Sequence, residues 1–301
     1  MRNRWVIESM AMAYALALSP VGPVAASPAE HVSIQSPQSA RQIVDRIQAQ
    51  LGVPRRPQTV DTFNAGDPDT PVTGIAVSMM ATFDVLQRAA ASGKNLVITH
   101  EPTFYNHVGE TTELEKEQDP VLAAKQAFVR THRMVVWRFH DGWHDRRPDG
   151  ILSGVVRALG WEAYQQQGAA NVFAMPETTL GALAKAIAQK LDARTLRYIG
   201  DPELKVTKVG MAPGFAGFGI NRHLLQRDDV QVEVIGEGHE WETGEYAADA
   251  VTAGLGKALI VVGHIPSEQA GMEECARWLK TFISDVPIEF VAAKHGYERV
   301  Q

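Results

Sequence analysis

The stretch Asn95-Leu96-Val97-Ile98-Thr99-His100-Glu101-Pro102 sets the pattern that the rest of the chain repeats. The apolar and β-branched run 96–99 is typical of a strand that is buried on both faces. A histidine and a glutamate follow this run directly, and Pro102 fixes the backbone just beyond them. In open α/β sheets, functional side chains collect at the carboxyl ends of the strands.

Two further apolar runs end in the same way. His140 follows the run 134–139, and His264 follows the run 258–263. Another ligand-type residue comes four positions after each of these histidines, namely His144 and Glu268. Imidazoles and carboxylates carried to one sheet edge from distant segments predict a metal centre.

Apolar runs alternate with segments of helical periodicity along the chain. The expected strands are 72–78, 95–99, 134–139, 172–175, 196–199, 206–211, 230–235, 258–262 and 288–292. The expected helices are 39–51, 82–92, 120–132, 149–159, 242–253 and 267–282, with a polar helix after the glycine-rich run 213–219. A further helix is expected after the segment 176–179 and runs through residue 191. This alternation indicates βαβ units and a mixed or parallel sheet. The predicted fold class is α/β, in two intertwined halves, 39–165 and 166–301, that form one functional unit.

Composition narrows the function classes. The 301 residues are 45% hydrophobic and 21% charged, which suits a globular protein of one large domain or two smaller ones. The net charge of −6, without a basic stripe, gives nucleic-acid binding little support. The single cysteine, Cys275, rules out an internal disulfide and a thiolate-rich zinc site. The sequence lacks a Gly-x-Ser-x-Gly elbow, and the run 213–219 lacks the lysine and spacing of a P-loop.

The N-terminus has the three parts of a secretory signal. Arg2 and Arg4 precede the apolar stretch 10–18, and small residues lead up to Ala26. This predicts a signal peptide over 1–26, a Ser/Pro/Ala-rich linker over 27–38 and a periplasmic or secreted protein. A leader helix or a misassigned start, with a cytoplasmic protein, is the alternative. The apolar stretch is too short to span a membrane, so we expect no membrane association after cleavage.

Each segment of the predicted centre also has a structural interpretation. Adjacent residues of an extended chain point in opposite directions, so His100 and Glu101 serve one site only if the chain turns there or if metals lie on both sides. The segment 139–145 carries four ionisable side chains in six positions, which bind a cation or form a solvated turn. Glu268 either ligates or stabilises the start of a helix. Glu237, in the acidic segment 236–242, is either a contact of the site or a helix-start carboxylate.

Taken together, the order and spacing resemble the Nif-three-like dinuclear metal-centre family, which includes proteins named as a type I GTP cyclohydrolase of the second kind. The resemblance covers about residues 39–298. Gly263, His264 and Glu268 match the family's Gly-His-x-x-x-Glu motif. In its His-His pair, His100 matches and Glu101 replaces the second histidine; in its His-x-x-x-Asp motif, His140 matches and His144 replaces the aspartate. Both replacements can ligate, and two carboxylates remain in the set.

The resemblance implies two related α/β halves and a ring-shaped homo-hexamer with metals facing an inner cavity. It also implies two metal ions. Ligation by nitrogen and oxygen at the carboxyl ends of the strands suits the divalent ions Zn, Mn, Fe, Ni or Mg. The expected ligands are His100, Glu101, His144, His264 and Glu268, while His140 either ligates or, like Asp141 and Asp145, orients a ligand. The predicted function is metal-dependent, cyclohydrolase-like hydrolysis of an anionic or amide-containing small molecule, with Glu237 or Asp141 moving protons. A non-catalytic metal-binding scaffold is the alternative.

Overall fold

The computed structural model describes residues 1, 37–294 and 296–298. Apart from residue 1, the predicted signal peptide 1–26 lies outside the described residues, as does the predicted linker as far as residue 36. The chain divides into the units Met1–Ser36 and Pro37–Gln301, and the second unit carries the helices and strands given below. In the part of the chain that is described, no helix is long and apolar enough to cross a membrane.

The first sheet has the strand order β1-β4-β3-β2-β11. Its members are β1 (Phe63–Ala65), β2 (Ile75–Ser78), β3 (Leu96–Thr99), β4 (Val135–Arg138) and β11 (Ile288–Phe290). β11, β2, β3 and β4 run parallel, and β1 pairs antiparallel with β4 at the edge. Every residue of β2, β3 and β4 is buried, as expected for parallel strands covered on both faces. The parallel neighbours β3 and β4 therefore end at one edge, where His100 and His140 follow.

The second sheet has the strand order β5-β6-β8-β9-β10-β7. Its members are β5 (Gln165–Gln166), β6 (Ala169–Thr179), β7 (Arg197–Ile199), β8 (Lys205–Ala212), β9 (Val232–Ile235) and β10 (Ala258–Val261). β8, β9 and β10 run parallel, and β5, β6 and β7 add antiparallel strands at the two edges. The three parallel strands lead into the loops that begin at residues 213, 236 and 262, at one edge of the sheet.

Helices connect the strands of both sheets. They are α1 (Ala40–Gln50), α2 (Phe83–Ala91), α3 (Thr112–Lys116), α4 (Pro120–Thr131), α5 (Asp141–Asp145), α6 (Gly150–Leu159), α7 (Leu180–Lys190), α8 (Phe218–Leu225), α9 (Glu245–Thr252) and α10 (His264–Leu279), with a 3₁₀ turn η1 (Glu162–Tyr164) and a π-helical turn η2 (Glu240–Gly244). Local sequence sets their starts: Ser39 and Gln42 form a capping box at α1, and Asp149 caps α6.

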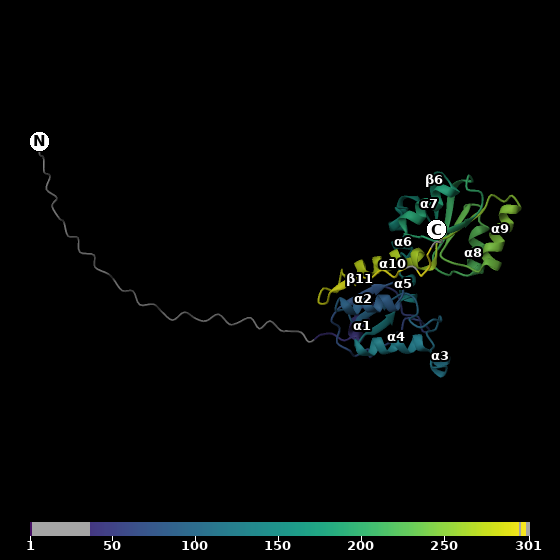
Figure 1. Cartoon of the computed structure of the whole chain (residues 1–301). Helices are drawn as coiled ribbons and strands as arrows, with labels where there is room; N and C mark the ends of the chain where they lie inside the picture. Colours follow the sequence, from purple (N-terminus) through teal and green to yellow (C-terminus); the bar gives the residue numbers. More distant parts are fainter. Residues whose placement is uncertain (2–36, 295, 299–301) are drawn as a thin grey trace. The chain divides into compact units, whose positions relative to one another are not determined.

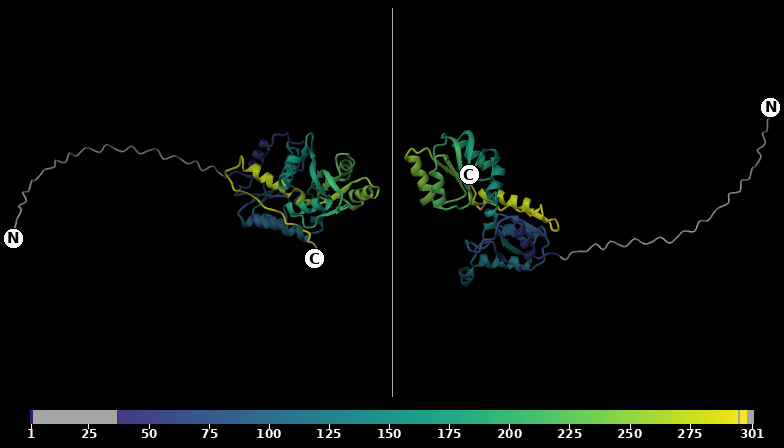
Figure 2. Two further views of the ribbon diagram at one scale, coloured as in Figure 1. Left: turned by 90° about the horizontal axis from the view of Figure 1, so that it is seen from above. Right: turned by 180° about the vertical axis from the view of Figure 1, so that it is seen from behind.

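The helices α6 and α10 lie side by side and join the two cores (Figures 1 and 2). A Cβ atom on Gly154 would stand 2.4 Å from the carbonyl oxygen of Ala270, and one on Gly271 would stand 2.5 Å from the Cα of Ile151. Only glycine permits this approach of two backbones. Val155 of α6 packs into the core of the second sheet, while the α10 residues Met272, Cys275 and Leu279 pack into the core of the first.

The α/β class and the two mixed sheets are confirmed, and several boundaries differ from the expectation. The predicted helix start at Ser267 is wrong: Gly263, with φ 103°, lets α10 begin at once with His264, and Pro266 fits its first turn. The predicted end of a strand at residue 175 is also wrong, because β6 continues to Thr179 through a register irregularity that accommodates Pro176. β11 comes from the C-terminal part of the chain and pairs with β2 of the first sheet.

Candidate metal centre

The chain turns directly after β3. The backbone N–H groups of His100 and Glu101 both donate to the carbonyl oxygen of Met79, at 3.2 and 3.0 Å. Two successive amides that share one acceptor interrupt the alternation of an extended strand. The turn, which is one of the two options that the sequence left open, is therefore present. One ligand atom each of His100, Glu101 and Glu268 lie within 4.8 Å of one another.

A one-turn helix places His140 and His144 together. Asp61, a buried residue in the loop before β1, accepts the backbone N–H groups of His140, Asp141 and Gly142 at 2.7 to 2.8 Å. This carboxylate caps the start of α5 in the way an N-cap does. The rings of the two histidines lie 4.9 Å apart between centroids. Helical spacing of four residues thus brings both imidazoles to one side of α5.

The four histidines of the centre are anchored in the same way, through Nδ1. The distances are 3.2 Å from His100 to the carbonyl oxygen of Phe139, 3.0 Å from His140 to Asp141, 2.9 Å from His144 to Asp149 and 2.8 Å from His264 to Glu237. In the neutral ring, an oxygen acceptor at Nδ1 places the proton on that nitrogen and leaves the lone pair of Nε2 to a ligand. This arrangement is typical of histidines that bind metal through Nε2.

The Nε2 atoms of His264 and His100 face the carboxylates of Glu101 and Glu268. Nε2 of His264 lies 3.2 Å from Oε2 of Glu268 and 3.5 Å from Oε1 of Glu101. Nε2 of His100 lies 3.7 Å from the same Glu268 oxygen. Both of these last two atoms are buried, and within the described residues neither has a hydrogen-bond partner, although Oε2 of Glu268 forms an ion pair with His264. Burying such atoms unpaired is unfavourable, and a cation between them would satisfy both. The residues present therefore fit a metal ion.

A second group of ligand atoms lies beside the first. One ligand nitrogen each of His100, His140 and His144 also lie within 4.8 Å of one another. The ring centroid of His100 is 4.5 Å from that of His140 and 4.9 Å from that of His144. His107, seven residues after His100, is exposed, and its ring centroid is 6.2 Å from that of His140. The groups of candidate ligands share His100.

The histidines of the candidate centre differ in the direction in which their surroundings shift the pKa. Burial, reinforced by the neighbouring imidazoles, lowers the pKa of His100 well below its ordinary value and also lowers that of His140. Burial acts to lower the pKa of His144 as well, but the carboxylate of Asp149 outweighs it and the pKa is raised. Neutral imidazole is the form that binds metal, so His100 and His140 are ready to ligate at neutral pH.

His264 behaves differently because it faces carboxylates. Burial acts to lower its pKa, yet contacts with three glutamates outweigh burial and raise that pKa to about 12. Burial likewise acts to raise the pKa of Glu101, but His264 and Arg138 lower it overall. In the absence of a metal, a proton on His264 thus supplies positive charge. Excess negative charge at this point is a further sign of a cation site.

Arg138 holds the loop of the candidate ligands His100 and Glu101 in place. Its buried guanidinium donates to the carbonyl oxygen of His100 at 3.0 Å and to Oε2 of Glu101 at 3.2 Å. The other oxygen, Oε1, remains directed at His264 and His140, at 3.5 and 3.9 Å. Glu101 therefore presents one oxygen to the centre.

Gly214 makes room for Glu268. A Cβ atom at this position would stand 2.2 Å from Oε1 of Glu268, and the residue has φ +67°. Its carbonyl oxygen accepts the N–H of Glu237 at 2.9 Å, and its own N–H donates to Ser267. The glycine-rich run 213–219, expected to be a turn, thus packs against a candidate ligand.

Asp141 and Glu237, the two carboxylates expected to move protons, differ in their contacts and in their exposure to solvent. Asp141 holds His140 with one oxygen, while the other accepts from Thr59 at 2.9 Å and Val60 at 3.2 Å, which describes an orienting residue. Glu237 orients His264 and keeps 53% of its side chain exposed. Asp145, expected as another orienting group, pairs instead with Arg56, at 2.6 Å.

Sequence reasoning missed Asp149 and Asp61. The sequence identified Asp149 only as the first residue of the predicted helix 149–159. One of its carboxylate oxygens accepts the backbone N–H of Leu152 and so caps this helix. Its second oxygen binds His144, which no spacing rule predicts because the chain turns between the two residues. Asp61 comes from the loop 53–71, where aspartate is common in any turn.

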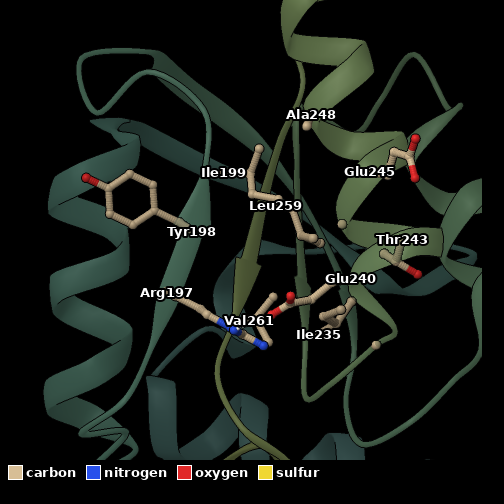
Figure 3. A pocket seen from close by; sticks show the side chains of 12 residues that line it. Arg197, Tyr198, Ile199, Ile235, Glu240, Thr243, Glu245, Ala248, Leu259 and Val261 are labelled. Atoms are coloured by element: carbon tan, nitrogen blue, oxygen red, sulfur yellow. Dashed lines mark hydrogen bonds and ion pairs between the residues drawn. The ribbon is translucent and has the colours of Figure 1, made fainter. Parts of the chain in front are cut away.

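A cavity of about 370 Å³ lies on the second sheet, between β7, η2 and α9 (Figure 3). Ile199, Ile235, Leu259 and Val261 contribute apolar side chains, and an ion pair between Arg197 and Glu240, 2.7 Å long, forms part of the wall. None of its lining residues in the described chain belongs to the candidate centre. The centre and this cavity are therefore separate features.

Fold and site together define an α/β protein with an imidazole–carboxylate centre at the carboxyl ends of its parallel strands. The chain belongs to the Duf34/NIF3 (NGG1p interacting factor 3) family, whose sequence profile matches residues 60–296. This confirms the family expected from the motifs.

Curated relatives carry the name GTP cyclohydrolase 1 type 2 homolog. One from Clostridium acetobutylicum is 25% identical over 160 residues, which are 50% of this chain and 58% of the relative. One from Clostridium perfringens is 22% identical over 243 residues, which are 77% of this chain and 86% of the relative. The first match thus spans little more than half the length of that relative.

Solved structures share the fold. A Bacillus cereus protein related to NIF3 superposes with a TM-score of 0.67 at 12% identity, covering 88% of this chain and 99% of the other. The Staphylococcus aureus protein SA1388 superposes with a TM-score of 0.63 at 15% identity, with the same coverage. At such identities the likeness concerns the fold alone.

Proposed function

We propose that the protein is a dinuclear metal-dependent hydrolase that acts on an anionic or amide-containing small molecule. The observation that carries the proposal is the uniform anchoring of the four histidines by Nδ1, which leaves their Nε2 atoms to share a site with Glu101 and Glu268. Nitrogen and oxygen ligands of this kind suit Zn, Mn, Fe, Ni or Mg, and the imidazoles favour borderline ions.

Bound divalent ions would supply Lewis-acid chemistry, polarising a carbonyl or phosphoryl oxygen of the substrate and acidifying water. The two ligand carboxylates leave part of the charge of two divalent ions uncompensated, so the site attracts phosphate or carboxylate groups. Names of the clostridial relatives, which refer to a cyclohydrolase, agree with a hydrolytic reaction.

The chain's own groups have defined roles in this proposal. Phe139, Asp141, Asp149 and Glu237 fix the imidazoles by accepting from Nδ1. Arg138 fixes the position of Glu101. Glu237, with about half of its side chain exposed and a pKa lowered by its contact with His264, is the carboxylate assigned to pass protons between the centre and solvent. Asp141, with both oxygens occupied, is assigned to orientation only.

A non-catalytic metal-binding scaffold is the second candidate, and the burial of the ligands favours it. His100 is 0% exposed and Glu268 is 3% exposed. Structural metal sites are closed, whereas catalytic ones keep an open coordination position. The two candidates therefore differ in whether a small ligand reaches the ions.

The experiment loads metal-free protein with Zn²⁺ or Mn²⁺ and measures hydrolysis across a panel of phosphoesters and cyclic and linear amides. The hydrolase proposal expects at least one substrate to turn over about 100-fold above background, with loss of turnover on chelation and in His144→Ala. Full metal content without turnover, together with a lower Tm or loss of the oligomer on chelation, contradicts it and favours the scaffold.

The proposal includes assembly and location. A homo-hexamer has six times the mass of the 32.9 kDa chain, less any cleaved segment, which light scattering measures. Export with cleavage after Ala26 predicts a mature protein that begins with Ser27, which N-terminal sequencing of periplasmic or secreted protein checks.

A further inference from the structure

We propose that the two ion positions are chemically unlike, so that the protein loads a borderline ion at one and a hard ion at the other. The imidazole position consists of His100, His140 and His144, and the carboxylate position consists of Glu101, Glu268 and His264. This inference rests on the proposed function in that it assumes a two-ion centre, and it adds which ion each position prefers and in what order the positions fill.

The imidazole position contains nitrogen ligands only. One nitrogen from each of its histidines lies within 4.8 Å of the other two, and the rings are 4.5 to 4.9 Å apart between centroids. The anchors at Nδ1 of His140 and His144 are aspartates outside the ligand set. Three neutral imidazoles leave the full double charge of a divalent ion in place, as in the three-histidine site typical of catalytic zinc.

The carboxylate position is built from oxygen. Oε1 of Glu101 and Oε2 of Glu268 lie 3.5 and 3.2 Å from Nε2 of His264. The two carboxylates neutralise a divalent ion formally. Because Arg138 occupies the other oxygen of Glu101, that residue binds through a single oxygen. Oxygen-rich sites of this kind suit Mn²⁺ or Mg²⁺ better than nitrogen sites do.

His100 links the two positions. It is a member of both groups of candidate ligands, and its buried Nε2 lies 3.7 Å from Oε2 of Glu268. Its Nδ1 donates to a main-chain carbonyl, that of Phe139, and so carries no charged anchor. A single Nε2 lone pair serves one ion at a time. If His100 binds the ion of the imidazole position, His264 is the sole nitrogen ligand of the carboxylate position.

The replacements in the family motifs create this asymmetry. His144 stands where the resemblance places an aspartate, and Glu101 stands where it places a histidine. The exchange keeps the total of two carboxylates but gathers both on the side of His264. The ion at the imidazole position would then keep its full charge and act as the stronger Lewis acid, while the charge of the ion at the carboxylate position is balanced by its two carboxylate ligands.

The test uses one equivalent of Zn²⁺ together with excess Mn²⁺ on metal-free, full-length protein, followed by desalting and elemental analysis. Limiting zinc matters because Zn²⁺ binds nitrogen and oxygen sites more tightly than Mn²⁺ in general. We expect about one zinc and one manganese per chain, as two-metal sites of this type hold one ion in each position. The electron paramagnetic resonance signal of protein-bound Mn²⁺ reports the carboxylate position independently of activity.

Two histidine truncations distinguish the positions. His144→Ala should lose zinc at the imidazole position while the bound-Mn²⁺ signal persists, and His264→Ala should keep zinc and lose that signal. Far-ultraviolet circular dichroism and the Tm of both metal-free variants check that each is folded, and Asp149→Asn replaces His144→Ala as a milder disruption of the same position if the latter fails to fold.

The outcomes separate this inference from the proposed function. Equal loss of both metals in both folded variants overturns the asymmetry. The same holds if the parent retains no manganese because the zinc occupies both positions in half of the chains. Either result leaves a dinuclear centre intact. Failure of the parent protein to retain either metal overturns the proposed function itself.

Discussion

Two buried glutamates illustrate how a protein treats a carboxylate that lacks a hydrogen-bond partner. Glu268 and Glu233 are both almost fully buried, and within the described residues both carry oxygens without a hydrogen-bond partner. Glu268 lies among imidazoles, 3.2 Å from His264 and 3.7 Å from His100. Glu233, in the middle of β9, has Gly210 and Leu259 as its register neighbours on the adjoining strands.

The surroundings decide how the negative charge is removed. Burial raises the pKa of Glu233 to about 9, so a proton neutralises it at physiological pH. Glu268 shares its location with other ligand groups, so a cation can neutralise it together with them. Burial alone therefore does not mark a functional carboxylate; convergence of further ligand atoms does.

The sharpest test of this comparison applies the same substitution to both residues. Glu268→Gln removes a charged ligand, so we expect affinity for the ion at the carboxylate position to fall by more than the roughly 10–100-fold that loss of an outer-shell partner causes. Glu233→Gln mimics the protonated acid and should keep the full metal content. Isothermal titration with Mn²⁺ measures both, and equal affinities in the two variants would contradict the comparison.

Gly214→Ala attacks Glu268 indirectly. The added Cβ would stand 2.2 Å from Oε1 of Glu268, so the carboxylate must move away, and we expect a loss of roughly 10–100-fold in metal affinity. Gly217→Ala is the matched control, because Gly217 also has positive φ, +82°, but nothing lies within 4 Å of its Cβ position. Both variants place a Cβ on a backbone with positive φ, but only the one at Gly214 meets Glu268. Equal metal affinities in the two would show that contact with Glu268 is irrelevant.

Asp149→Asn should have a smaller effect, about 10-fold in affinity at the imidazole position. Asparagine still caps α6, but it weakens the charge-assisted hydrogen bond that orients His144. Asp119→Asn provides the control, because Asp119 caps α4 through Leu122 and contacts no histidine of the centre. Zinc titration of both variants checks the expectation, and unchanged affinity in Asp149→Asn would argue against the orienting role of Asp149.

Glu233→Gln should leave metal binding intact and change only the pH dependence of stability. The folded-state pKa of Glu233, about 9, lies above the ordinary value of 4.5, so the folded state holds a proton that the unfolded state releases. The contribution of this proton to the free energy of unfolding is fully present at pH values below the pKa of the unfolded state. It declines by up to about 1.4 kcal/mol per pH unit as the pH rises toward the pKa of the folded state. The variant should lack this decline.

Urea denaturation of the chelated parent and the chelated Glu233→Gln variant between pH 5 and pH 9 measures the difference. Chelation removes any contribution of bound metal to the pH profile. Parallel profiles would mean that Glu233 is not protonated in the folded protein.

The sequence was sufficient to predict the α/β class and the strands that carry the centre, because buried parallel strands are continuous apolar runs. β3, β4 and β10 illustrate this. It was not sufficient for β1, a three-residue edge strand without an apolar run, or for the start of α10, which depends on the backbone angle of Gly263. Such features depend on local backbone geometry that composition does not encode.

The same division holds for the centre. Spacing was sufficient to single out His100, His140 and His264, since each follows a buried strand. The grouping into an imidazole set and a carboxylate set was not predictable, because it depends on how two sheets from distant parts of the sequence pack. The anchors Asp61 and Asp149 were missed for the same reason: their partners are backbone amides and a ring nitrogen brought close by the fold.

Metal retention by the parent protein and by His100→Ala decides whether the buried imidazoles and carboxylates hold metal ions. Both proteins are loaded with Zn²⁺ and Mn²⁺, desalted and measured by elemental analysis, with circular dichroism to confirm that the variant is folded. We predict about two ions per chain in the parent and loss of at least the imidazole-position ion in the variant, because His100 belongs to both groups of ligand atoms. A parent that retains no metal, or a folded variant that retains as much as the parent, would contradict the account.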